Sequence, residues 1–439
     1  MYNYYNKKIV VIGLGKTGLS CINFFLRRDI VPMVLDTRKF PPELNKLPNF
    51  VKYKLGPLRC EDIILFDLII VSPGLSLNDP TLLYARKIGI EIIGDIELFC
   101  RELQFISIVA ITGSNGKSTV SSLLYRIANA SGIKVILAGN IGIPVLDTLK
   151  NYAQLYILEL SSFQLETIFS LSSEVSTVLN VCCDHMDRYF NDIIEYRSFK
   201  LRIYNNSKIC LVNVDDILTF PFNKIFRKCI SFGSYTGDYC MVKYRGSLWL
   251  SVYGERVLNT SKIKLFGFYN YINCLAVLAI SDIMFFPRKI ILRIFSLFKG
   301  LKHRFQLVHQ RNNIKWINDS KSTNLSSTLA ALINFKNNIG FVWLFLGGIL
   351  KSTFLSSLDG YLYKDKIKLC CFGKDGMFIY SSYPNISVYR NTIEELVINI
   401  MPIVRSGDVI LFSPACSSFD QFKNFEERGK YFLRIANKY

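Results

Sequence analysis

Four groups of residues have the types and spacing of a site that consumes a nucleotide. They are the glycine-rich run Thr112-Gly-Ser-Asn-Gly-Lys-Ser-Thr119, then Glu159-Leu-Ser-Ser162, then Asp184-His185, and finally His303-Arg304 leading to Asp319-Ser-Lys-Ser-Thr-Asn324. A glycine turn that presents backbone N–H groups and a lysine suits a triphosphate, and strand-end acids suit the magnesium ion that accompanies it. The series therefore predicts an enzyme that consumes ATP.

The glycine-rich run is a shortened form of the Walker A phosphate loop, since the strict pattern needs a further glycine where Ile111 stands. Lys117 can neutralise the β- and γ-phosphates, Ser118 can offer its hydroxyl to Mg²⁺, and the helix expected to start near Val120 faces the anion. An isolated Gly-Lys-Ser would be a solvated turn, but the apolar strand before it argues against that alternative. The residues expected to bind ATP phosphates are Gly113, Ser114, Asn115, Gly116, Lys117, Ser118 and Thr119.

Two further residues at strand ends are candidate metal ligands. Glu159 follows the apolar run 155–158, and it would lie beside the phosphate loop if the two strands are neighbours. A helix-capping role, with Ser161 close by, is the alternative. His185 follows the run 177–181, but Mg²⁺ prefers oxygen, so a structural histidine is the alternative there.

Lys200 stands out through helix geometry. In the helix expected over 191–204 it shares one face with Ile193, Tyr196 and Ile203. A buried lysine tends to lose its charge, and its neutral amine can react with CO₂ to give a carbamate, which is an anionic metal ligand. An ammonium group that reaches solvent at the end of its stem is the alternative.

A second glycine turn, Gly13-Leu-Gly-Lys-Thr-Gly18, follows the first apolar run of the chain, and Asp36 ends the next. This context suits a dinucleotide, so an NAD-dependent dehydrogenase is one interpretation, and a turn that binds another nucleotide or none is a second. The phosphate loop downstream favours a uridine diphosphate instead. The residues expected to contact it are Gly15, Thr17, Asp36, Thr37, Arg38, Ser72 and Gly74.

Length and hydrophobic pattern bound the fold. A chain of 439 residues, 50% of them hydrophobic, can bury two or three separate cores. Short apolar runs that alternate with helical stretches predict parallel α/β sheets, and the alternating residues within 229–265 predict a small antiparallel part. We expect an α/β protein with three domains at 1–95, 96–301 and 302–439.

The charge and cysteine content bear on partners and compartment. The net charge of +19, with basic residues around 290–298, raises the alternative of an ATPase that binds nucleic acid or a membrane surface. The basic residues are spread along the chain, however, which favours compositional drift. The twelve cysteines lack zinc-like spacing and fit free thiols in a reducing cytosol, and the longest uncharged apolar run, 339–350, is shorter than the ~20 residues of a membrane span. We expect a cytoplasmic monomer with no nucleic-acid partner and no stable membrane insertion.

Eight stretches spread over the whole chain resemble the Mur ligases. They are residues 112–119, 139–144, 158–165, 184–189, 200–204, 303–305, 318–324 and 413–429. The phosphate loop is shared with folylpolyglutamate synthases, so a related amide ligase of that kind is an alternative. The stretches 184–189 and 413–429 are more specific.

The resemblance implies a Rossmann-like UDP-binding domain, a central phosphate-loop ATPase domain and a carboxyl-terminal Rossmann-like α/β domain. It implies an ATP-dependent ligase that adds D-glutamate to UDP-N-acetylmuramoyl-L-alanine through an acyl phosphate, in the cytoplasmic synthesis of peptidoglycan precursors.

The resemblance also implies roles for individual residues. Catalysis and Mg²⁺ binding would involve Lys117, Ser118, Glu159, His185, Arg304 and Lys200 as a carbamate. Asn270, Arg304 and Asp319 would contact ATP. The remaining substrate contacts would come from Asn140 near the UDP-substrate, and from Lys321, Thr323, Lys351, Ser418, Phe419 and Phe425 around the amino acid.

Two positions depart from the family pattern. Tyr269 stands before Asn270 where the family usually has histidine. Ile349 and Leu350, next to Lys351, occupy positions where a polar or small pair is common.

Overall fold

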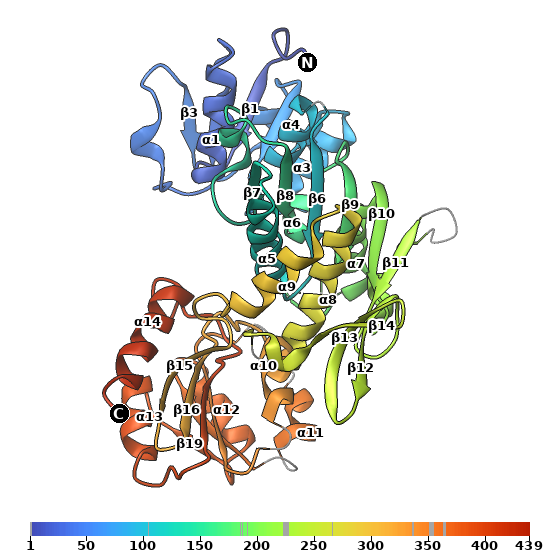
Figure 1. The fold of residues 1–439 in the computed structure, drawn as a ribbon. Helices are drawn as coiled ribbons and strands as arrows, with labels where there is room; N and C mark the ends of the chain where they lie inside the picture. The colour runs from blue at the N-terminus through green and yellow to red at the C-terminus, as the bar shows by residue number, and fades with distance from the viewer. Residues whose placement is uncertain are drawn as a thin grey trace.

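The computed structural model describes residues 2–103, 105–184, 186, 188–190, 192–222, 228–265, 267–335, 338–350, 355–362 and 366–439. Three sheets follow one another in chain order, and Figure 1 shows them in a row from the amino-terminal part, through the central part, to the carboxyl-terminal part.

The first sheet has five parallel strands in the order β3-β2-β1-β4-β5. Alternate residues of its central strand pack into different cores, Ile9 and Val11 on one face and Val10 and Ile12 on the other, which is why that strand is a continuous apolar run. Its strands are β1 (Ile9–Ile12), β2 (Met33–Asp36), β3 (Tyr53–Leu55), β4 (Leu68–Val71) and β5 (Glu91–Ile93). Its helices are α1 (Lys16–Leu26), α2 (Cys60–Ile63), α3 (Pro80–Lys87) and α4 (Asp95–Glu102).

The central sheet has nine strands in the order β14-β13-β12-β11-β10-β9-β6-β8-β7. The pairs from β7 to β12 are parallel, and the last two pairs are antiparallel. The strands are β6 (Ser107–Thr112), β7 (Val135–Gly139), β8 (Leu155–Glu159), β9 (Ser172–Val178), β10 (Asn206–Asn213), β11 (Cys229–Phe232), β12 (Tyr239–Tyr244), β13 (Ser247–Val252) and β14 (Glu255–Asn259). The helices are α5 (Lys117–Ala130), α6 (Ser162–Leu165), α7 (Ile193–Leu201), α8 (Phe268–Ile283) and α9 (Arg288–Leu297), and α5 packs against both α8 and α9.

The third sheet has six strands in the order β15-β16-β20-β17-β18-β19, parallel except for the β15–β16 pair. The strands are β15 (Gln306–Arg311), β16 (Ile314–Asn318), β17 (Val342–Gly347), β18 (Ile367–Phe372), β19 (Ser387–Tyr389) and β20 (Val409–Phe412). The helices are α10 (Leu325–Leu332), α11 (Asp359–Leu362), α12 (Gly376–Ser382), α13 (Ile393–Ile400) and α14 (Phe425–Ala436).

The predicted α/β class, with parallel sheets and a small antiparallel part, is confirmed. The domain boundaries stay predictions. Two element predictions were wrong in detail. The helix after the phosphate loop begins at Lys117 rather than near Val120. Strand β9 runs from Ser172 to Val178 rather than over 177–181, because its first half is polar and an apolar run does not reveal it.

Among the described residues, no helix combines the length and the apolar character needed to cross a membrane.

Candidate active site

The phosphate loop joins β6 to α5 at the carboxyl end of the central parallel strands. Gly113 and Gly116 have φ angles of 154° and 86°, which L side chains rarely adopt. A Cβ on Gly116 would also stand 2.6 Å from Oδ1 of Asn273. The turn ends at the amino end of α5, whose first N–H groups lack helical partners and therefore suit an anion.

Lys117 lies over this loop. Its Nζ donates to the backbone oxygens of Gly113 (2.6 Å) and Ser114 (3.0 Å). An ammonium group has three N–H donors, so these two bonds leave one for a phosphate oxygen. Burial lowers the pKa of Lys117, and the negative charges of Glu159 and Asp184 oppose that shift.

Asn180, which sequence reasoning overlooked, clamps the loop from the end of β9. Its Oδ1 accepts from the Asn115 N–H (2.8 Å), and its Nδ2 donates to the Asn115 oxygen (3.1 Å) and to the Tyr269 hydroxyl (2.8 Å). Tyr269 therefore supports the loop from α8. The signal in the sequence was the amide side chain of Asn180 near the end of the mostly apolar run 177–181.

Ser114 is held by the segment that follows Asn180. Its Oγ accepts from the Cys182 N–H (3.0 Å), and it lies 3.1 Å from both the Cys182 oxygen and the hydroxyl of Tyr196. Cys182 and Tyr196 were not assigned roles from the sequence, because their contacts with the loop span 68 and 82 residues of chain.

Glu159 ends β8, which lies directly beside β6, so the carboxylate is next to the phosphate loop as predicted. It is 1% exposed and accepts from Oγ of Ser121 (3.3 Å) and from Nδ2 of Asn140 (3.0 Å). The following helix is capped by Ser161, whose side chain exchanges hydrogen bonds with Gln164. Ser161 therefore supplies the capping that was the alternative for Glu159.

His185 lies outside the described residues. Its neighbour Asp184 is described, and its Oδ2 accepts from Nδ2 of Asn324 at 3.0 Å. This bond joins the segment after β9 to the loop before α10. The group at Asp184 and the group that ends at Asn324, both singled out in the sequence, are therefore in contact.

Lys200 lies near the end of α7 and is 1% exposed. Its Nζ is 4.5 Å from the centre of the Tyr196 ring. Burial, followed by the positive charge of Lys117, holds the pKa of Lys200 well below its ordinary value. The environment therefore favours the neutral amine over an ammonium group that reaches solvent.

Arg304 reaches the phosphate loop from the segment that precedes β15. Its Nη2 donates to Oγ of Ser118 at 2.8 Å. The residues on either side, His303 and Phe305, have φ angles of 62° and 43°, so the backbone turns sharply to aim this side chain. The Phe305 N–H donates to Oδ1 of Asp319 (2.9 Å), which anchors that turn.

Asp319 and Lys321 extend the charged group. Burial raises the pKa of Asp319 to about 6, although hydrogen bonds from Ser322, Phe305 and Ser413 and the charge of Arg304 lower it. Burial and the charge of Arg304 lower the pKa of Lys321 to about 8. Cations gathered this closely are best stabilised by an anion with several charges.

A cleft between the central and carboxyl-terminal parts opens beside the loop. It is lined by Asn115, Gly116, Thr119, Tyr269, Asn270, Arg304, Asp319, Lys321 and Asn334, among others. The three residues predicted to contact ATP outside the loop, Asn270, Arg304 and Asp319, are all in it.

A second cleft, of about 500 Å³, lies at the carboxyl end of the first sheet, where β1 is flanked by β2 and β4. All eight residues predicted to contact the UDP-substrate line it: Gly15, Thr17, Asp36, Thr37, Arg38, Ser72, Gly74 and Asn140. Lys16, Phe163 and Gln164 also line it and were missed.

The Asp36 carboxylate is already hydrogen-bonded to other residues of the chain. Its carboxylate accepts from the Leu14 N–H (2.6 Å) and from the backbone N–H, Nε and Nη2 of Arg38 (2.8, 2.9 and 2.7 Å). Burial raises the pKa of Asp36, but these bonds outweigh burial and the net shift is downward. The carboxylate thus orients Arg38 and the glycine turn, whereas a dinucleotide site would use it to hold ribose hydroxyls.

The residues predicted to bind the amino acid are only partly brought together. Lys321 Nζ lies 3.9 Å from the centre of the Phe425 ring, close to the ATP cleft. Lys351 lies outside the described residues. Thr323, Ser418 and Phe419 line neither of the two clefts; Ser418 is buried, and Phe419 is 72% exposed.

Arg428 is a buried residue whose role was not foreseen from its motif. It donates to the backbone oxygens of Cys416 (3.0 Å) and Ser320 (2.9 Å) and to Oγ of Ser320 (3.1 Å). It therefore ties α14 to the loops that carry Lys321 and Ser418. Burial lowers its pKa to about 10.

The chain is an α/β protein with a phosphate loop at the end of the central sheet and a nucleotide-sized cleft at the end of the first sheet. Comparison with known proteins identifies the family within that class. Residues 7–94 match the family described as "Mur ligase MurD-like, N-terminal domain", and residues 111–281 match "Mur ligase middle domain". The chain belongs to the Mur ligase family.

Similar proteins extend the match to the full length. The chain is 50% identical over 438 residues, with 100% of both chains covered, to the UDP-N-acetylmuramoylalanine--D-glutamate ligases of Salmonella typhimurium (strain LT2) and Escherichia coli (strain K12). Its fold is similar to that of MurF ligase from Thermotoga maritima, solved in complex with ADP. The TM-score is 0.63, the identity is 17%, and 100% of this chain and 96% of that chain are covered.

Proposed function

We propose that this chain is an ATP-dependent ligase that joins the amine of D-glutamate to the carboxylate of UDP-N-acetylmuramoyl-L-alanine. The observation that carries the proposal is the 50% identity over the full length to ligases with that name. The geometry supports it, because Asn140 lines the UDP cleft and donates to Glu159 beside the phosphate loop. Asn140 thus links the UDP cleft to the acid beside the phosphate loop, and transfer between two bound substrates requires that their sites lie close together.

The reaction would have two steps. The substrate carboxylate attacks the γ-phosphorus of ATP, which gives an acyl phosphate and ADP. The amine of D-glutamate then attacks the acyl carbon, and phosphate leaves with the bridging oxygen. The chain would contribute position and charge, with Lys117 on the phosphates and with Arg304 and Lys321 facing the negative charge that moves between oxygens.

We include Mg²⁺ in this proposal on the chemistry of its donors. The Glu159 carboxylate accepts from two neutral donors, Ser121 and Asn140, which leaves lone pairs for a cation, and the Ser118 hydroxyl would be a second oxygen ligand. Within the described residues no three His, Cys, Asp or Glu side chains gather around a metal position, so phosphates would supply further ligands, as is usual for Mg²⁺. When bound, Mg²⁺ would neutralise phosphate charge. His185 and a carbamate on Lys200 complete the proposed ligand set.

We also place the enzyme in the cytoplasm as a monomer. All twelve cysteines are free, which is usual in a reducing compartment.

Phosphate release tests the proposed function. With ATP, Mg²⁺ and UDP-N-acetylmuramoyl-L-alanine, release should depend on D-glutamate and should not occur with L-alanine, meso-diaminopimelate or folate substrates. Release that depends on one of these others would replace the proposal. NAD binding in place of uridine-nucleotide binding would do the same.

A further inference from the structure

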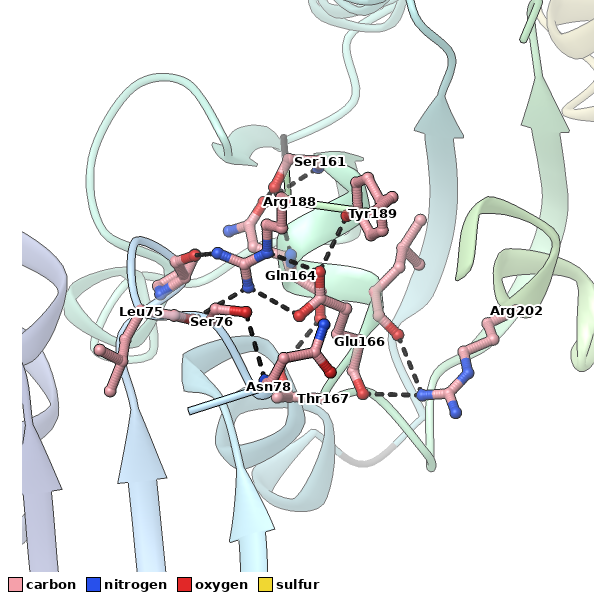
Figure 2. Close-up of polar contacts among 12 residues, drawn as sticks. Leu75, Ser76, Asn78, Ser161, Gln164, Glu166, Thr167, Arg188, Tyr189 and Arg202 are labelled. Carbon is pink, nitrogen blue, oxygen red and sulfur yellow. Dashed lines mark hydrogen bonds and ion pairs between the residues drawn. The ribbon is translucent and has the colours of Figure 1, made fainter. Parts of the chain in front are cut away.

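Arg188 lies between the amino-terminal and central parts of the chain and forms hydrogen bonds with residues of both. Its Nη1 donates to the Pro73 oxygen (3.0 Å), and its Nη2 donates to the Leu75 oxygen (2.9 Å). Its Nε and Nη2 also form two bonds with the carboxylate of Glu166 (2.9 and 2.7 Å). Figure 2 shows the guanidinium between Leu75 and Glu166. The side chain is 9% exposed, so these bonds are largely shielded from water.

The partners of Arg188 on one side form a wall of the UDP cleft. Pro73, Gly74 and Leu75, which follow β4, all line that cleft. The Arg188 guanidinium also lies 4.1 Å from the centre of the Phe163 ring, another lining residue. Arg188, which does not itself line the UDP cleft, therefore holds these lining residues in position.

On the other side, a chain of contacts leads from Arg188 to the phosphate loop. The Tyr189 hydroxyl donates to Oε1 of Glu166 (2.8 Å), the acid that Arg188 holds. The Tyr189 ring lies 5.1 Å from the Tyr196 ring, and the Tyr196 hydroxyl lies 3.1 Å from Oγ of Ser114 in the phosphate loop.

The two ends of this connection are also close in the sequence. Cys182, which is hydrogen-bonded to Ser114, and Arg188, which is hydrogen-bonded to the UDP cleft wall, both lie between β9 and α7. Asp184, bonded to Asn324 of the third part of the chain, lies between these two anchors.

We propose that Arg188 is a positioning residue that couples the UDP cleft to the phosphate loop, so that each bound nucleotide strengthens the binding of the other. The proposal rests on the proposed function. Coupling of this kind is reciprocal and requires a physical connection whose arrangement both ligands bias. The connection here runs through Glu166, Tyr189 and Tyr196.

Arg188→Lys is the informative variant. Lysine keeps the positive charge, but its three N–H donors share one nitrogen, so it cannot make the four bonds that Arg188 makes to a carboxylate and two carbonyls. Arg202→Lys is the matched control. Arg202 also bonds a backbone oxygen at this junction, that of Glu166 (2.7 Å), but its bonds to Leu165 and Glu166 do not reach the UDP cleft wall.

Calorimetric titration of the full chain measures the coupling directly. The affinity for UDP-N-acetylmuramoyl-L-alanine is measured with and without a non-hydrolysable ATP analogue and Mg²⁺, in the wild type, Arg188→Lys and Arg202→Lys. Arg188→Lys should weaken UDP-substrate binding by about tenfold or more, because loss of one hydrogen bond to a charged group typically changes an affinity by about that factor. It should also bring the coupling factor between the two ligands close to one. Arg202→Lys should leave both values within about twofold of the wild type.

The outcomes separate the two proposals. If the wild type does not bind the UDP-substrate, the proposed function fails. If the wild type binds it and Arg188→Lys retains both the affinity and the coupling factor, the role of Arg188 is overturned. A loss of affinity with an unchanged coupling factor would also overturn it, because Arg188 would then shape one cleft only. Melting temperatures of the three proteins check folding. If Arg188→Lys does not fold, Glu166→Gln replaces it, because that variant weakens the same ion pair from the other side and should show the same losses of affinity and coupling. Unchanged affinity and coupling in Glu166→Gln would then overturn the role of Arg188.

Discussion

The guanidinium of Arg304 donates to the hydroxyl of Ser118 at 2.8 Å, across 186 residues of chain. This bond brings a cation from the start of the third part onto the hydroxyl that we assign to Mg²⁺. We expect that binding of ATP with Mg²⁺ moves Arg304 from Ser118 onto a phosphate oxygen. Closure of the carboxyl-terminal part on the central part would change the geometry of this bond.

Arg304→Ala should lower the rate of phosphate release by roughly a hundredfold or more, because it removes a charge aimed at the reacting phosphate. Arg126→Ala, on the exposed face of α5, is the matched control and should retain near-normal turnover. Equal rates in the two variants would contradict the role of Arg304.

Lys117→Ala should reduce turnover by roughly a hundred- to a thousandfold while the protein remains folded. The hydrogen bonds of the Lys117 side chain go to the backbone oxygens of Gly113 and Ser114, so its removal takes away support within the loop and not a contact of the hydrophobic core. Circular dichroism checks the fold, and Lys134→Ala, at an exposed position, serves as the control. Activity close to that of the wild type would remove the phosphate loop from the mechanism.

Lys200→Ala should abolish activity, and added short carboxylic acids should restore part of it. The reason is that a carboxylate can take the place of the carbamate in the space left by the side chain. Lys208→Ala, at an exposed position on β10, should need no additive. Full activity of Lys200→Ala without additive would exclude the carbamate.

Nucleotide binding should take up protons above pH 8. Burial and Arg304 hold the pKa of Lys321 at about 8, below its ordinary 10.5, so the folded protein binds fewer protons than the unfolded chain between these values. The contribution of Lys321 to stability therefore rises with pH across that window. A nearby phosphate favours the protonated amine. Calorimetry in buffers of different ionisation enthalpy measures the uptake, and Lys321→Met should reduce it; identical uptake in both proteins would speak against this placement.

Tyr269→Phe should raise the KM for ATP by about two- to tenfold, the scale of one neutral hydrogen bond, because Asn180 loses its hydroxyl partner. Tyr271→Phe, on the same helix, is the control. An unchanged KM in Tyr269→Phe would show that Asn180 clamps the loop without help from α8.

Local chemistry was predictable from the sequence, whereas long-range support was not. The phosphate loop and the strand before it were identified because each is formed by residues that are consecutive in the sequence. Asn180 and Tyr196 were missed because their contacts with the loop span 65 and 82 residues. The contact of Asp36 with the UDP-substrate stays a prediction, because Asp36 lines that cleft, but only the structure shows that its carboxylate also binds Arg38 and Leu14.

The most direct test of the ligase account follows an oxygen atom. UDP-N-acetylmuramoyl-L-alanine with a heavy-oxygen label in its carboxylate is incubated with ATP, Mg²⁺ and D-glutamate, and the released phosphate is analysed by mass spectrometry. An acyl phosphate is formed by attack of that carboxylate and cleaved between carbon and oxygen, so one labelled oxygen should appear in phosphate, and only when D-glutamate is present. Unlabelled phosphate, or release that does not depend on D-glutamate, would contradict the account.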